Sequence, residues 1–410
     1  MSTPSKTGPS AQLLCSWSLA IALAFSLKAM TAAAAALSAT DVELPTLLEI
    51  TTVRQNQSQQ DALSSSPFRS SAWLAAVPSV SLNYLQSDED QGTDEIELSL
   101  NFPLKSPYLA RQDKALRRLQ TSLSSRDAER RALYFSGLLR ETLWSERIAR
   151  TRVQFTSDKI TQLAALHQRQ LSLFEARAAN RYSLLLLRQE LADARLLLAE
   201  QELELARWRQ NYRQLTGMGN LPLAIDEPAP PSGEAWQTHP ALAMLDLGWE
   251  RERASIAASS GRAGTWNLAF QAKQLETPEL DENQYGVAIE VPLSMLATAS
   301  ESSASEWRDS SRRYWQARDE LALQLSRSWQ ALRAEAQYLE KRQGLLSEAT
   351  EASQALLAET RLLAGENELA REIWVRRILG DLDKQAEAAI NELLIGQNRA
   401  MSRQAAGIPL

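Results

Sequence analysis

The sequence predicts a mainly α-helical, internally duplicated fold in which β-hairpins alternate with very long antiparallel helix pairs. Stretches of roughly 100 residues contain almost no helix breakers, and two short segments alternate strictly between apolar and polar residues. Glycine and proline are scarce, at 15 each in 410 residues, while Ala, Leu, Arg, Glu and Gln dominate. This composition is typical of long helices and coiled coils.

The N-terminus has the pattern of a targeting segment. Lys6 precedes an apolar run at 13–27, and a tract of small residues follows at 31–40. We therefore expect a signal peptide over 1–38. The alternative is a membrane anchor, but about 15 apolar residues are few for a spanning helix. The single cysteine, Cys15, lies in this segment, so the mature chain would have neither disulfides nor thiol chemistry.

The first hairpin is predicted over 79–102. Residues 95–102 read EIELSLNF, in which every second residue is apolar, and residues 80–84 alternate in the same way. A period of two indicates a strand with two different faces. The polar stretch 87–94 between them predicts the turn. Pro103 is expected to end the second strand because proline has no backbone N–H to donate.

A short helical segment is expected before this hairpin and a long helix pair after it. Asp41 is a possible N-cap of the short segment, and Pro67 is a possible break. Over 105–217 apolar residues recur at three- and four-residue spacing. A reversal within 174–183 divides this region into two helices, with Asn180 or Ser183 as the N-cap of the second. The first would be on the order of 100 Å long.

The second half repeats the first. A proline-rich linker at 218–239 leads to a short helix from Pro240 to about residue 260. A second hairpin is predicted over 265–292, with its turn at 275–283, and a second helix pair over 300–406 reverses near 365–367. The two Pro-Leu pairs that follow the hairpins are 189 residues apart, and the closing glycines, Gly217 and Gly407, are 190 apart. These offsets predict two repeats, 39–217 and 240–410.

The apolar face of each predicted hairpin must be shielded from water. An isolated hairpin is only marginally stable in water, and helices of such length cannot cap a compact sandwich. In a bilayer, strands must close into a barrel so that every backbone polar group is paired. Four strands are too few for a closed barrel, so we expect several copies to contribute four strands each. The alternative is a periplasmic coiled-coil scaffold or adaptor without a barrel, which has no need of two such hairpins.

Composition excludes several other classes of function. With 50 acidic and 44 basic residues, the net charge of -6 gives no basis for nucleic-acid binding. The only histidines, His167 and His239, are far apart and have no cysteine near them, so we expect no metal site and no cofactor. No arrangement of a nucleophile with a base indicates an enzyme.

The order of these elements resembles the outer-membrane factor (TolC-like) family over essentially the whole mature chain. The matching positions are Pro78 with SVSLNY, LSLNFPL at 98–104, Leu215-Thr216-Gly217, His239-Pro240, GVAIEVPL at 286–293 and Leu363-Ala364-Gly365. The resemblance implies a homotrimer in the Gram-negative outer membrane, with a shared 12-stranded β-barrel and an α-helical tunnel in the periplasm. It also implies a passive conduit of a tripartite efflux or type I secretion system, gated at the helix tips, which dock to a periplasmic adaptor and an inner-membrane pump.

Two sets of candidate site residues follow from this resemblance and from the alternation. The strand pattern places Glu95, Glu97, Lys273 and Glu290 on the barrel lumen. The three glutamates either form an acidic lining that favours cations, weakened by Lys273, or are ordinary solvated residues. The expected docking and gate residues at the tips are Arg177, Asn180, Arg181, Gly365, Glu366, Asn367, Arg371 and Trp374.

The chain departs from the family pattern at these tips. Family members usually have a glycine at both helix turns, but the first turn here has Arg177 and no glycine. Many members have an acidic pair beyond the second turn, where this chain has Arg371 and Trp374, with Glu366, Glu368 and Glu372 nearby. The constriction at the tunnel entrance is therefore expected to be built differently.

Overall fold

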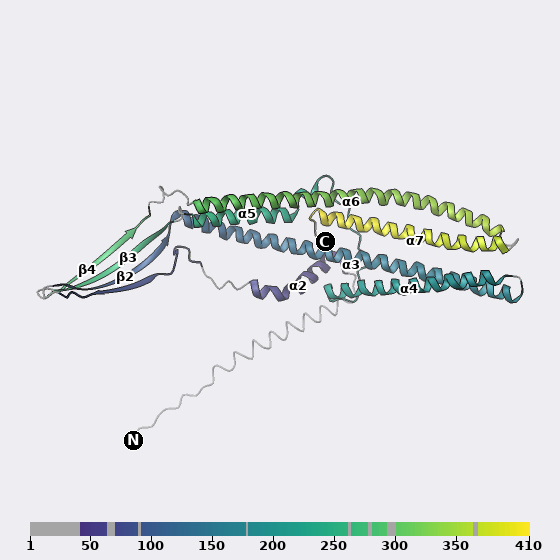
Figure 1. Ribbon diagram of the computed structural model, residues 1–410, viewed down its shortest axis with the longest axis horizontal. Helices are drawn as coiled ribbons and strands as arrows, with labels where there is room; N and C mark the ends of the chain where they lie inside the picture. Colours follow the sequence, from purple (N-terminus) through teal and green to yellow (C-terminus); the bar gives the residue numbers. More distant parts are fainter. Residues whose placement is uncertain are drawn as a thin grey trace, which may run out of the picture.

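The protein is an elongated molecule with a β-sheet at one end and long helices running away from it (Figure 1). The computed structural model describes residues 42–63, 70–88, 92–177, 179–260, 264–277, 281–292, 301–363 and 368–410, without the side chains of 56–63, 361–363 and 368–372. The expected signal peptide, Asp41 and Pro67 lie outside the described residues. In the part that is described, no helix is both long and apolar enough to cross a bilayer.

Four antiparallel strands form one sheet in the order β1-β2-β3-β4. They are β1 (Ser79–Leu85), β2 (Asp94–Lys105), β3 (Thr265–Glu276) and β4 (Asp281–Glu290). The two predicted hairpins are confirmed, and pairing of β2 with β3 joins them edge to edge. Strands from the two halves of the sequence therefore share one continuous surface.

The expectation that Pro103 ends its strand is wrong, because β2 continues to Lys105. The Pro103 carbonyl accepts a hydrogen bond from Ala75 N (2.8 Å), and Lys105 N donates to Trp73 O (2.8 Å). Pro103 therefore turns its backbone polar groups toward the segment before β1, where pairing is reduced to an isolated bridge. Because its nitrogen does not face β3, the lack of an N–H there leaves the ladder with β3 intact.

The second turn is shorter than predicted. The strands continue to Glu276 on one side and from Asp281 on the other, so Leu275 pairs with Glu282 within the range expected to be a turn. Both faces of the sheet become largely polar here, so alternation of hydropathy gives no signal of a strand.

The first helix pair consists of α3 (Pro107–Glu175) and α4 (Arg181–Thr216). Ser106 caps α3, with its hydroxyl accepting from Leu109 N (3.2 Å), and Pro107 occupies a helix start that needs no N–H donor. Asn180, one of the two predicted caps, begins α4, since its Oδ1 accepts from Ser183 N at 2.8 Å. The predicted reversal between the helices is confirmed.

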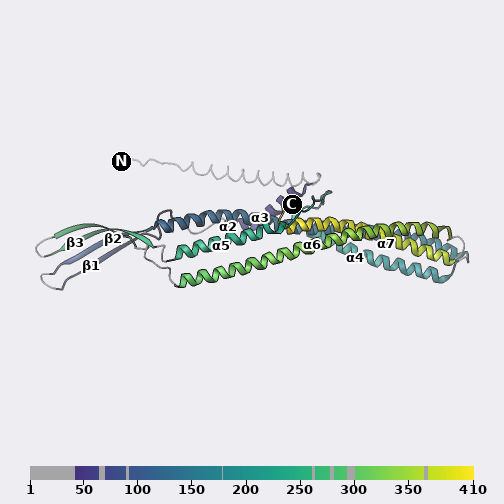
Figure 2. The same cartoon turned by 90° about the horizontal axis from the view of Figure 1, so that it is seen from above.

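The other helices are α2 (Leu44–Leu63), the short 3-10 helix η2 (Ala235–Thr238), α5 (Pro240–Ser259), α6 (Glu301–Leu363) and α7 (Glu368–Ala405). Gly217 and Gly407 both end their helix pairs in the left-handed conformation, with φ of 76° and 77°. α3 packs against α4, α5 and α7, and α6 packs against α5 and α7 (Figure 2).

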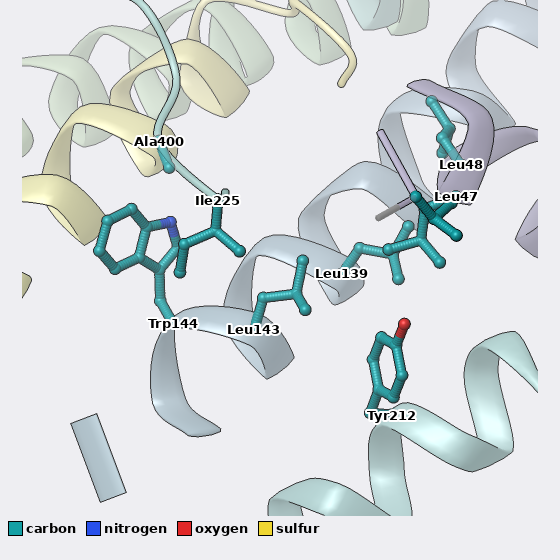
Figure 3. Packing of buried hydrophobic residues seen from close by; sticks show 9 residues of the cluster. Leu47, Leu48, Leu139, Leu143, Trp144, Tyr212, Ile225 and Ala400 are labelled. Carbon is teal, nitrogen blue, oxygen red and sulfur yellow. The ribbon is translucent and has the colours of Figure 1, made fainter. Parts of the chain in front are cut away.

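The main core lies midway along the molecule, where α2, α3, α4, α7 and the linker meet. Leu47 and Leu48 of α2 face Leu139 and Leu143 of α3, with Tyr212 of α4 beside them (Figure 3). Trp144, Ile225 and Ala400 extend the cluster to the linker and α7. Burial of this side chain set fixes the middle of the helical rods, so the sheet and the helix tips project from a common rigid centre.

Candidate functional site

The sheet has one apolar face that nothing in the described part of the chain covers. The register puts Leu98 beside Leu82 on β1 and Ala272 on β3, and continues with Phe270 beside Val287 on β4. The large side chains among them are exposed, at 47% for Leu98, 68% for Leu82 and 65% for Val287. A soluble protein rarely leaves such a continuous apolar face open to water.

The opposite face of the sheet is polar and carries all four residues predicted for the lumen. By register, Glu97 lies opposite Lys273 and Asn267 lies opposite Glu290, with Glu95 two residues before Glu97. Lys273 Nζ forms an ion pair with Glu95 Oε2 at 2.7 Å. Among the described residues, Glu97 and Glu290 form no ion pair. The structure thus brings the four together on one face and neutralises one of the three acids.

The sheet also has two unpaired edges. In the described part of the chain, β1 pairs only with β2, and β4 pairs only with β3. Open edges present backbone N–H and C=O groups that seek a partner strand. An apolar face and two open edges together are what one sector of a larger barrel would show.

The first helix tip is described and the second is largely not. Arg177 is exposed in the turn after α3, Asn180 caps α4 and Arg181 is the exposed first residue of α4. Gly365, Glu366 and Asn367 lie outside the described residues, as does the side chain of Arg371. Trp374 is half-buried, and its Nε1 has no hydrogen-bond partner among the described atoms.

A second feature of α4 was not predicted from the sequence. One side of this helix packs on α3 through Leu187, Leu191, Ala194 and Leu205, which are buried. A second stripe at seven-, four- and three-residue spacing is exposed and consists of Leu185, Ala192, Leu196, Ala199 and Leu203. We call this stripe the outer seam. Its heptad spacing is visible in the sequence once the helix's buried side is known.

α6 shows a corresponding pair of stripes. Leu339 and Leu346 are buried, whereas Tyr338 and Leu345 beside them are exposed at 61% and 57%. α4 and α6 flank the tip half of the molecule, because α3 and α7 pack against each other between them. Both flanks therefore present apolar side chains that the described part of this chain does not cover.

A buried ion-pair cluster in the middle of the molecule also escaped sequence analysis. Arg140 of α3 is 1% exposed and donates to both carboxylate oxygens of Glu227 in the linker, at 2.8 and 2.6 Å. Arg403 of α7 donates to the same carboxylate at 3.1 Å. This cluster ties the linker to both repeats. Nothing in the sequence indicates it, because charges 87 and 176 residues apart carry no local pattern.

The titratable groups with shifted pKa values in the middle of the molecule have structural roles. Burial raises the pKa of Tyr212 to about 12, and its hydroxyl donates to Asn220 O at 2.9 Å. Burial lowers the pKa of His239, whose Nδ1 accepts from Ala241 N at 3.1 Å and so caps α5. Neither group lies on the sheet or at a tip.

Comparison with solved structures identifies the fold. OprN, described as an outer-membrane channel, matches with a TM-score of 0.63 and 13% identity over 89% of each chain. VceC, an outer membrane protein of Vibrio cholerae, matches with a TM-score of 0.58 and 13% identity over 88% of this chain and 96% of its own. The MtrE outer membrane channel of Neisseria gonorrhoeae, in its open state, matches with a TM-score of 0.58 and 13% identity over 89% and 86%.

This chain has the fold of these outer-membrane channels. At the level of the fold, the match confirms the resemblance expected from the sequence, including the duplicated hairpins and helix pairs. No protein-family model matches the sequence, and no curated protein does.

Proposed function

We propose that this chain is one of three identical subunits of a channel in the outer membrane of a Gram-negative cell. Three copies would supply a 12-stranded barrel in the membrane and a helical tunnel in the periplasm. The conduit would be passive, serving a tripartite efflux or type I secretion system, and would do no chemistry. The observation that carries this proposal is the sheet with one exposed apolar face, one polar face and two open edges.

The two faces agree with the two environments of such a barrel. Apolar side chains such as Leu98 and Val287 would meet lipid tails, and the polar face would line the water-filled lumen. Glu95, Glu97, Lys273 and Glu290 would then face the lumen. The Lys273–Glu95 ion pair would leave a weakly acidic lining.

The flanks of the helical region support assembly from several copies. In a closed ring, the edge strand β4 of one copy would meet β1 of the next, and α6 would meet α4. The outer seam of α4 and the exposed stripe of α6 would then be buried against each other. The partners beyond the trimer would be a periplasmic adaptor and an inner-membrane pump at the helix tips, where we also place the gate.

Fractionation and conductance test this proposal. The full chain is expressed with its N-terminal segment, and we expect a trimer in the outer-membrane fraction that conducts ions in planar bilayers. Recovery of a soluble periplasmic monomer would instead favour a scaffold or adaptor without a barrel.

A pair of arginine substitutions tests the face assignment. Leu98→Arg on the apolar face should cost about 2–4 kcal/mol per subunit near the bilayer midplane and reduce trimer yield. Gln271→Arg lies at a similar level on the polar face, opposite Ser99, and should leave assembly unchanged. Equal effects of the two substitutions on trimer yield would contradict the assignment.

A further inference from the structure

The turn between α3 and α4 contains a backbone conformation that its residue does not favour. Arg177 has a φ of 56° and is the one non-glycine residue with positive φ among those described. Its N–H donates to Phe174 O at 2.9 Å, which closes the turn. At Gly217, Gly233 and Gly407 the chain uses glycine for positive φ. Glycine at 177 would remove the steric cost, so the fold itself gains nothing from an arginine there.

Arg181 is also at a position that the fold does not favour. It is the first residue of α4, where unsatisfied N–H groups and the helix dipole favour negative charge. The first turn of α4 contains no acidic residue. Two neighbouring arginines therefore both oppose local preferences, which points to a role outside the chain's own stability.

The surroundings of these arginines define a basic and partly apolar surface. Arg177, Arg181, Phe174 and Tyr182 are all exposed, the last two at 38% and 63%. We call these four residues the tip patch. Glu175 is the only acid in 174–189, and Arg188 adds a further positive charge. Within the described residues, neither Arg177 nor Arg181 forms an ion pair.

The location of the tip patch determines how a partner could reach it. The C-terminal end of α3 and the N-terminal end of α4 lie at the opposite extreme of the molecule from the sheet in both views (Figures 1 and 2). α3 is 69 residues long, so the patch would stand about 100 Å from the sheet. A partner would meet it end-on, away from the outer seam's contact between copies.

We propose that the tip patch binds a periplasmic protein surface that carries carboxylates flanked by apolar side chains. The guanidinium groups of Arg177 and Arg181 would donate charge-assisted hydrogen bonds to the carboxylates, and Phe174 and Tyr182 would be covered by the apolar neighbours. This proposal rests on the proposed function, because it specifies the chemistry of the partner at the channel's tips. Such binding weakens as salt rises, since exposed charges are screened.

Two synthetic probes test the proposal on the full-length trimer. Each is a two-helix hairpin peptide with leucines beside its turn, and the turn carries either aspartate and glutamate or lysines. We expect the acidic probe to bind at low salt and the lysine probe not to bind. Arg177→Glu should weaken the acidic probe by on the order of ten-fold and allow the lysine probe to bind. Arg195→Glu, the same change farther along α4, should alter neither.

A glycine variant separates a binding role from a structural one. Arg177→Gly should raise the melting temperature by roughly 1–3 °C, because the strain is relieved, and should still weaken the acidic probe. A lower melting temperature would mean that the arginine serves the fold and would overturn the proposal. So would failure of the acidic probe to bind, or equal binding of both probes. Binding to phosphatidylglycerol vesicles without binding of the acidic probe would assign the patch to lipid and also overturn it.

Failure of this inference is distinguishable from failure of the proposed function. Native mass and conductance are measured on the same preparation. A conducting trimer without preference for the acidic probe refutes only the inference. A preparation that forms neither trimer nor pore refutes the proposed function itself.

Discussion

The two long helix pairs have similar lengths and the same topology but are held together differently. Toward the tips the contact between α3 and α4 is apolar, with Leu163 fully buried against Leu187, Leu191 and Ala194; nearer the centre, Arg209 of α4 donates to the buried Glu146 of α3 at 3.1 Å. Between α6 and α7 the contact contains buried amides. Asn391 donates to Leu339 O at 3.0 Å, and Asn398 donates to Leu332 O at 3.1 Å.

The spacing of these buried amides explains how they affect the alignment of α6 and α7. The two asparagines are seven residues apart on α7, and their acceptors are seven apart on α6. Each buried amide needs a backbone carbonyl of α6 to accept its N–H, so the two hydrogen bonds together fix the register of α7 along α6. Apolar contacts such as those of α3 and α4 contribute more free energy but discriminate less between neighbouring registers. We infer that the apolar contact in the tip half of the first pair serves stability and that the buried amides of the second pair serve alignment.

The largest predicted difference in stability comes from replacing one buried residue in each contact. Leu163→Ala should lower the free energy of unfolding by about 2–5 kcal/mol, because it leaves a cavity in a fully buried site. Asn391→Leu should change it by less than about 1.5 kcal/mol, because a lost hydrogen bond is offset by apolar burial. Denaturant unfolding of the trimer measures both.

Hydrogen exchange should distinguish the same two substitutions in a second way. Hydrogen exchange should show α6 and α7 less protected in Asn391→Leu, since their register is no longer fixed, and unchanged protection of α3 and α4. If Asn391→Leu were as destabilising as Leu163→Ala, the two contacts would not differ in kind.

A smaller effect is predicted where the two repeats touch. A Cβ added at Gly396 of α7 would overlap the indole ring of Trp144 of α3. Gly396→Ala should therefore force the indole aside and cost about 1–3 kcal/mol in thermal or denaturant unfolding.

Gly380, on the same helix, is the matched control. An added Cβ there would have no atom within 4 Å, so Gly380→Ala should stabilise α7 by up to about 1 kcal/mol through helix propensity. A harmless Gly396→Ala would show that α7 is not closely packed on α3, and that the repeats are held mainly by the Arg140–Glu227 cluster.

The smallest effect is a pH dependence of stability at the start of α5. His239 caps α5 as a neutral acceptor, and burial lowers its pKa in the folded chain. The unfolded chain therefore takes up a proton first, so stability present above about pH 6.5 should decline as pH falls through the folded pKa. His239→Asn keeps a capping side chain without titration and should flatten this part of the pH profile.

Hydrogen exchange localises this effect. On acidification, exchange should rise at the start of α5 and not in α3 or α4. An unchanged slope in His239→Asn would place the pH dependence elsewhere in the chain.

The sequence by itself determined the elements and their duplication. Strand alternation at 95–102, a helix cap at Asn180 or Ser183 and the closing glycines are all local signals. They depend on the backbone preferences and hydropathy of residues a few positions apart. For the same reason the resemblance to the outer-membrane factor family could be inferred from element order together with short local motifs.

Only the tertiary structure decided how these elements are combined. Pairing of β2 with β3 carried the strand through Pro103, and the buried side of α4 revealed its outer seam. The Arg140–Glu227 cluster and the carbonyl partners of Asn391 and Asn398 join residues 52 to 176 positions apart in the chain. Such contacts have no local signal, because they depend on which faces meet after the chain has folded.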